Sequence, residues 1–266
     1  MLKALRETWA VTLLFGLGLG LVEALLAIAL PSLQRQLGDL LERLGFVQQF
    51  LKVLVGMDVA GELGPDLFVA LRWVHPVVLA LLWAHAIIHC TRLPAGEVDR
   101  GTIDVLLGLP ISRWSLFVSE SLIWLTCAVA VLMMGLAGSL VGGTRNPPEY
   151  RPELGRVAMV LVNLGFLYLA VGGLAWCVSA LSDHRGRAIA VVFAVVLGSF
   201  LINYLAQLWK PAERLSVLSV LTYYRPLFIL RDGAWPAKDL AVLGGTALVV
   251  WSAAGWTFSR RDLATT

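Results

Sequence analysis

Charged residues are scarce in this sequence. Only 15% of its 266 residues are Asp, Glu, Lys or Arg, whereas an average soluble domain carries about a quarter. Hydrophobic residues make up 58% of the chain, and the mean hydropathy is +0.79. This composition excludes an ordinary soluble protein and predicts a membrane protein.

Basic stripes and cysteine frameworks are also missing. The formal net charge is only +3, and the Lys and Arg residues are scattered rather than interleaved with aromatic residues in one stripe, so we expect no nucleic-acid partner. Cys90, Cys127 and Cys177 lie in or at the edge of apolar runs. They indicate small buried side chains rather than a disulfide framework or a metal cluster.

A phosphate-binding loop is absent as well. The pattern GxxxxGK[ST] does not occur, and this loop is what cradles the phosphates of ATP in many ATPases. The chain is therefore predicted not to be an enzyme by itself, and any ATP that drives it must be bound by another chain. Gly16, Gly18, Gly20 and the pair Gly172–Gly173 fall inside apolar runs, where they predict close helix contacts.

Long apolar runs are what the sequence does contain. Their length, roughly 17 to 25 residues, suits helices that cross a hydrocarbon core of about 30 Å. Six runs are present, at residues 13–30, 74–90, 116–141, 157–181, 188–205 and 240–258. The sequence thus predicts an all-α membrane protein in which residues 1–266 form one transmembrane domain of six spans, with both termini on one side.

Two amphipathic segments and one aromatic-rich segment flank these spans. Leu and Val residues recur at helical spacing through residues 33–51 with charges on the other face, which predicts a helix at the outer membrane surface. This helix could be a lid or subunit contact, or it could simply pack over the bundle. Residues 2–9 predict a short interfacial helix on the opposite side, and residues 209–239 a re-entrant or interfacial piece with an aromatic belt.

A polar island at residues 97–113 reads EVDRGTIDVLLGLPISR. Gly101 should break the preceding structure, and Thr102 is a good N-cap for a brief amphipathic helix that carries Ile103, Leu106 and Leu107. Gly108 and Pro110 should end it. Such a helix suits insertion into a groove of a soluble partner, although a plain solvated loop between two spans has a similar composition.

The pattern E…GT…LL…P.SR in this island resembles the loop after the second span in permease subunits of type-2 ABC exporters. The chain end, FSRRDL at residues 258–263, resembles the terminus of that family. The resemblance implies that the loop supplies a cytosolic coupling helix, which contacts the ATP-hydrolysing subunit. The implied coupling residues are Glu97, Gly101, Thr102, Ile103, Leu106, Leu107, Pro110 and Arg113.

The same resemblance implies the rest of an exporter. The chain would be a permease in the plasma (inner) membrane with both termini cytosolic, paired with a second copy or a paralogue and surrounded by lipid. An ABC ATPase partner would bind ATP and Mg²⁺, and its closure would switch the pathway between inward-facing and outward-facing states. Members of the family move drugs, peptides, lipids, glycans and ions, so the resemblance names no substrate.

Polar residues inside the spans are candidates for the pathway, because a charge in the hydrocarbon core is costly. Glu23 lies in the middle of the first run and is either a pathway residue or a hydrogen-bonded structural carboxyl. Asn163 and Asn203 are similar candidates. Glu120 lies near the expected cytosolic end of the third run, where type-2 permeases commonly carry Lys, so this chain departs from the family there.

Two other classes of protein stay open at this point. His85 and His89 stand one helical turn apart with Cys90 adjacent, which would suit a zinc or copper site or, with Glu23, an intramembrane enzyme. No HExxH or GxSxG pattern accompanies them. The third class is a secondary transporter that works without an ATPase.

Overall fold

A computed structural model describes residues 2–43, 64–108, 110–148, 151 and 153–261 of the chain. Throughout these residues the regular structure is helical. The elements are α1 (Leu2–Arg43), α3 (Pro65–Trp73), α4 (Pro76–Cys90), α5 (Ala95–Asp99), α6 (Ile103–Leu107), α7 (Arg113–Gly143), α8 (Leu154–Leu181), α9 (Arg185–Leu208), α10 (Lys210–Glu213), η2 (Ser216–Leu218), η3 (Val220–Tyr223), α11 (Pro226–Asp232) and α12 (Ala237–Arg260).

Among the described residues, six helical segments are long and apolar enough to cross a membrane, as the sequence predicts. They are Thr8–Ser32, Pro65–Cys90, Arg113–Gly143, Leu154–Leu181, Arg185–Leu208 and Ala237–Arg260. The all-α membrane fold is therefore confirmed. The helices run a few residues past the apolar runs at most ends, because a helix continues into the polar interface until a capping or breaking residue stops it.

The first helix differs from its prediction. α1 is continuous from Leu2 to Arg43 and contains Pro31 without ending there, so residues 2–9 form its first turns rather than a separate interfacial helix. The region expected as a separate surface helix begins as the continuation of α1, and its residues 44–51 lie outside the described part of the chain. The sequence between residues 2 and 13 has no Gly or Pro to break the helix.

The second span is longer than predicted and is broken. It begins at Pro65, and the break falls between Trp73 and Pro76. Pro76 has no N–H and its ring displaces the preceding turn, so α3 must stop before it. α4 then restarts with Pro76 at its first position, and the His75 side chain accepts a hydrogen bond from the Val77 N–H at 3.3 Å. The charged residue Arg72 interrupts the apolar run, so the hydropathy pattern did not predict α3.

Close helix packing is provided by glycine, but partly at unexpected positions. A Cβ placed on Gly138 of α7 would lie 1.9 Å from the Gly20 carbonyl oxygen of α1, and one on Gly142 would lie 2.4 Å from that of Ala24. α1 and α7 therefore pack backbone to backbone, as small residues allow in membranes. Gly20 and Gly172 have close neighbours as predicted, whereas a Cβ on Gly18 would meet nothing within 4 Å.

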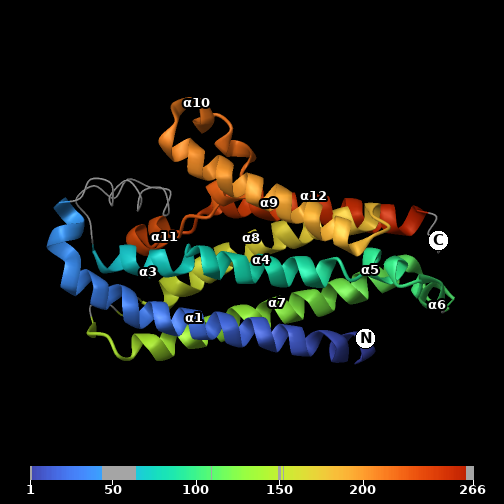
Figure 1. Cartoon of the computed structure of the whole chain (residues 1–266), viewed down its shortest axis with the longest axis horizontal. Coiled ribbons are helices and arrows are strands. Elements are labelled where there is room, and N and C mark those ends of the chain that lie inside the picture. The colour runs from blue at the N-terminus through green and yellow to red at the C-terminus, as the bar shows by residue number, and fades with distance from the viewer. Residues whose placement is uncertain (1, 44–63, 109, 149–150, 152, 262–266) are drawn as a thin grey trace.

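The two ends of the bundle carry different elements (Figure 1). The start of α1, the end of α12, α5 and α6 lie together at one end, and α3 and α11 lie at the other. α8 packs along α12, and α4 lies between α1 and α8. α9 leans away from the bundle with α10 at its tip (Figure 1) and exposes Phe193, Leu197 and Leu201. The start of α1 and the end of α12 therefore lie at the same end of the bundle, as an even number of spans requires.

Candidate functional site

The loop expected to bind a partner folds into two short helices, α5 and α6. Gly101 joins them with a φ of +67°, a left-handed conformation that glycine adopts without strain. Thr102 occupies the N-cap position of α6, but its side chain does not cap that helix. Its hydroxyl instead donates to the Glu97 carboxylate at 2.6 Å, and Arg100 pairs with the same carboxylate. Glu97 therefore holds α5 and α6 together, and the predicted capping hydrogen bond is wrong.

α6 itself forms over Ile103–Leu107 and turns its apolar residues mainly toward the bundle. Ile103 is 0% exposed, and Leu106 and Leu107 pack against the core while remaining partly exposed. Val105 is 73% exposed and projects away from the bundle. Residues at i, i+3 and i+4 mark the face that a helix buries. The apolar face that the sequence assigned to a partner's groove therefore packs mainly against the chain's own bundle, because Ile103 is fully buried there. Val105, which that pattern left out, is the exposed apolar residue of α6.

One ion pair and one hydrogen bond connect the helices at this end of the bundle. Arg92, which follows α4, pairs with Glu120 of α7, and both side chains are largely buried. Arg113 at the start of α7 donates to the main-chain carbonyl of Arg261, just past α12. Glu120, where the family commonly has Lys, is therefore the partner of Arg92.

Glu23 lies in the middle of α1 and is 0% exposed. In the part of the chain that the structure describes, neither carboxylate oxygen has a hydrogen-bond partner. The positive charge that attracts Glu23 is Arg72 of α3, which is 4% exposed. Arg72 lies two residues before the predicted start of the second span at residue 74, so the apolar pattern gave no sign of it. Two opposite charges thus lie in the interior of the helix bundle.

The asparagines predicted for the pathway both hold the segment between α9 and α12. The Asn163 amide of α8 donates to the Tyr223 carbonyl at 3.1 Å and accepts from the Arg225 N–H at 3.2 Å. Asn203 of α9 accepts from the Thr222 hydroxyl at 3.3 Å. These contacts give both side chains a structural role around η3.

His85 belongs to a hydrogen-bond chain that crosses four helices. Trp124 Nε1 donates to the Tyr168 oxygen at 2.9 Å, and the Tyr168 hydroxyl donates to His85 Nδ1 at 2.8 Å. His85 Nε2 then donates to the Thr12 hydroxyl at 3.4 Å, and Thr12 donates to the Thr8 carbonyl at 2.9 Å. Every member is satisfied when His85 is the neutral Nε2–H tautomer, so the chain links α7, α8, α4 and α1.

The metal-site alternative finds no support in this arrangement. Both His85 ring nitrogens are already used, and His89 Nε2 is buried without a hydrogen-bond partner among the residues that the structure describes. Among the described residues, no three His, Cys, Asp or Glu side chains are placed to hold a metal ion.

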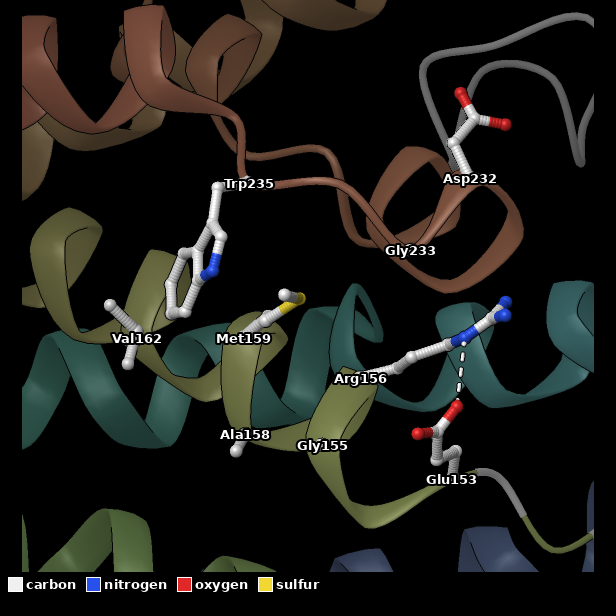
Figure 2. Close-up of a pocket in the computed structure, with 9 residues that line it drawn as sticks. All are labelled: Glu153, Gly155, Arg156, Ala158, Met159, Val162, Asp232, Gly233 and Trp235. Atoms are coloured by element: carbon white, nitrogen blue, oxygen red, sulfur yellow. Dashed lines mark ion pairs between the residues drawn. The ribbon is translucent and has the colours of Figure 1, made fainter.

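A pocket of about 510 Å³ lies at the opposite end of the bundle, between the start of α8 and the connection from α11 to α12. Figure 2 shows Trp235 and Met159 on one side and the charged Glu153, Arg156 and Asp232 on the other. Arg156 pairs with Glu153 at 3.3 Å and donates to the carbonyl of Leu230. Its guanidinium is thus engaged within the chain, which leaves the pocket as a surface hollow.

Six apolar helices, buried polar links between them and a short two-helix loop at one end define a multi-pass helical membrane protein. The family model of the ABC-2 family transporter protein matches residues 4–263. The chain therefore belongs to this family, whose members are the membrane components of ABC transporters and are not themselves catalytic. Searches among curated proteins and among solved structures found no match.

Proposed function

We propose that this chain is the membrane-spanning permease of an ATP-driven exporter in the plasma (inner) membrane and that α6 is its docking element for the ATPase. Family membership supports an ABC transporter, whose membrane component works with ABC ATPases. The observation that carries the docking role is the exposure of Val105, which projects from α6 at the end of the bundle where α1 starts and α12 ends. That end faces the cytosol in this proposal.

Because the sequence contains no phosphate-binding loop, the partner ATPase binds ATP and Mg²⁺ in this proposal. Two permeases, either two copies or this chain with a paralogue, enclose the pathway. Closure of the ATPases moves the α5–α6 segment (residues 95–107) and switches the pathway between two states, because the partner contacts that segment differently in each state. α9, which is little buried by its own chain, supplies apolar surface for the second permease or for lipid.

Capture of the ATPase tests the docking role. The chain is expressed together with an ABC ATPase from the same genome, and the ATPase is recovered through a tag on the permease. Val105→Asp should lower the recovery by about tenfold or more, since an unpaired charge buried in an apolar contact costs a few kcal/mol. Val105→Thr has nearly the same shape and should bind almost normally.

The capture result is informative only if the substitutions leave the folding of the permease unchanged. Val105 is exposed, so both variants should be extracted in the same yield and elute at the same size as the original chain. Undiminished recovery of the ATPase with Val105→Asp would mean that α6 is not the docking element.

A further inference from the structure

The α8–α9 turn lies directly against the α5–α6 segment, although more than 70 residues separate them in sequence. The Ser179 side chain of α8 is fully buried at this contact. Its hydroxyl accepts a hydrogen bond from the Ala95 N–H at 3.2 Å and donates one to the Leu93 carbonyl at 3.0 Å. One side chain of α8 thus binds the main chain on both sides of Pro94, where α5 begins.

Arg185, the first residue of α9, makes a second contact with the same region. Its guanidinium donates to the Ile88 carbonyl of α4 at 2.9 Å. Its Cδ would lie 3.2 Å from a Cβ on Gly96, so the side chain passes closely over α5. The glycine at position 96 provides the room for this contact.

An exposed pair completes this side of the turn. His184 Nδ1 lies 3.1 Å from the Asp99 carboxylate at the end of α5. Both groups are open to solvent, so this pair adds little to stability. Ser179 and Arg185, which are more enclosed, carry most of the connection.

The opposite side of the turn is held by the end of the chain. Arg261 donates to the carbonyls of Ala180 and Ser182 at 2.9 and 3.3 Å and pairs with Asp183. The last carbonyls of α8 are therefore satisfied by a basic side chain, which also suits the negative end of a helix. Since Arg113 donates to the Arg261 carbonyl, the turn is also connected through Arg261 to the first residue of α7.

We propose that the α5–α6 segment moves α8 and α9 directly through Ser179 and Arg185, so that these two are positioning residues of the transport cycle. The segment is covalently joined only to α4 and α7. Without the contacts of Ser179 and Arg185, a displacement of α6 would reach α8 and α9 only through the general packing of the bundle. The buried hydrogen bonds of Ser179 to Leu93 and Ala95 tie α8 to the start of α5. The part-buried Arg185 binds the Ile88 carbonyl of α4 and passes closely over Gly96, so α9 is tied to the end of α4 and rests on α5. This inference rests on the docking role proposed for α6.

Distances between spin labels test the inference in the complete transporter. On a background with Cys90, Cys127 and Cys177 replaced, one label pair at Ile111 and Val129 reports on the loop that joins α6 to α7, relative to the middle of α7. A second pair, at Phe193 and Val129, reports on α9. All three labelled side chains are exposed. Both distances are measured in the complex with a hydrolysis-deficient ATPase, with and without ATP and Mg²⁺.

ATP should change both distances in the original chain. In Ser179→Ala and in Arg185→Met, the change at Ile111 should remain while the change at Phe193 is lost. Arg185→Lys keeps a donor for the Ile88 carbonyl and should recover part of it. Gly186→Ala is the matched control in the same turn, because a Cβ there meets nothing within 4 Å, and it should leave both changes intact.

The outcomes separate this inference from the docking role. If ATP still moves the Phe193 label to the full extent in both Ser179→Ala and Arg185→Met, the two residues do not transmit the motion. If ATP moves neither label in the original chain although the ATPase is bound, the docking role of α6 fails first. Two variants are used so that misfolding of one leaves the other as the test.

Discussion

The Tyr224 hydroxyl donates a hydrogen bond to the main-chain carbonyl of Trp73, 3.1 Å away. In an unbroken helix this carbonyl would accept from the Val77 N–H, but that N–H donates to the His75 side chain at the break between α3 and α4. Tyr224, which follows η3, therefore supplies the donor that the broken second span lacks. The segment between α9 and α12 is thereby tied to α3.

Tyr224→Phe should destabilise the protein by about 1–3 kcal/mol, because it leaves a buried carbonyl without a donor. The measurement is thermal unfolding of the purified chain in detergent, where the midpoint should fall by several degrees. Tyr204→Phe is the matched control, since Tyr204 lies on the exposed side of α9, and it should be nearly silent. Equal stability of Tyr224→Phe and the original chain would contradict the proposed importance of this bond.

Glu23 and Arg72 should depend on each other. Glu23→Leu leaves Arg72 buried without its opposite charge, so it should cost about 3–5 kcal/mol. Glu23→Leu combined with Arg72→Met removes both charges and should recover much of that loss. Unfolding of the two single variants and the double variant completes the cycle, and strictly additive losses would mean that the charges do not interact.

Glu23→Gln separates the pathway role from a structural one. The amide keeps the volume of the side chain and loses its charge. If Glu23 lines the pathway in another state of the cycle, assembly with the ATPase should persist while transport changes. Normal transport by Glu23→Gln would end the pathway prediction for this residue.

The isolated chain should bind no nucleotide, because its sequence contains no phosphate-binding loop. Titration of the purified chain with ATP and Mg²⁺ by calorimetry should give no heat of binding. Micromolar affinity in the absence of the ATPase would overturn this expectation.

The α6 end of the bundle should face the cytosol. Ser112 lies beside α6, whereas Thr144 follows α7 at the other end. In the background without native cysteines, a membrane-impermeant thiol reagent added to intact cells should label Thr144→Cys and spare Ser112→Cys until the cells are opened. The reverse labelling would invert the topology.

Gly138→Leu should disrupt the contact between α1 and α7, because even its Cβ would lie 1.9 Å from the Gly20 carbonyl oxygen. We expect a large loss of folded protein, seen as aggregation on size-exclusion chromatography. Gly18→Ala, on a part of α1 where a Cβ meets nothing within 4 Å, should behave like the original chain. A well-folded Gly138→Leu variant would show that α1 and α7 can separate at this point.

The span count could be predicted from the sequence because a membrane helix needs only a long enough apolar run, which is a property of the chain in one dimension. The helix at Ile103–Leu107 was likewise predictable, since Gly101 and Gly108 bound it on either side. The hydropathy pattern lost α3, because Arg72 is counted as polar although the folded chain buries it.

Which side chains meet could not be read from the sequence. The His85–Tyr168 hydrogen bond spans 83 positions, Ala95–Ser179 spans 84 and Tyr224–Trp73 spans 151. Apolar periodicity found a face of α6, but only the packing of Ile103, Leu106 and Leu107 against the bundle decided that this face points inward and that Val105 points out. Local patterns specify where helices begin and end, whereas the pairing of helices is decided by how their surfaces fit together in three dimensions.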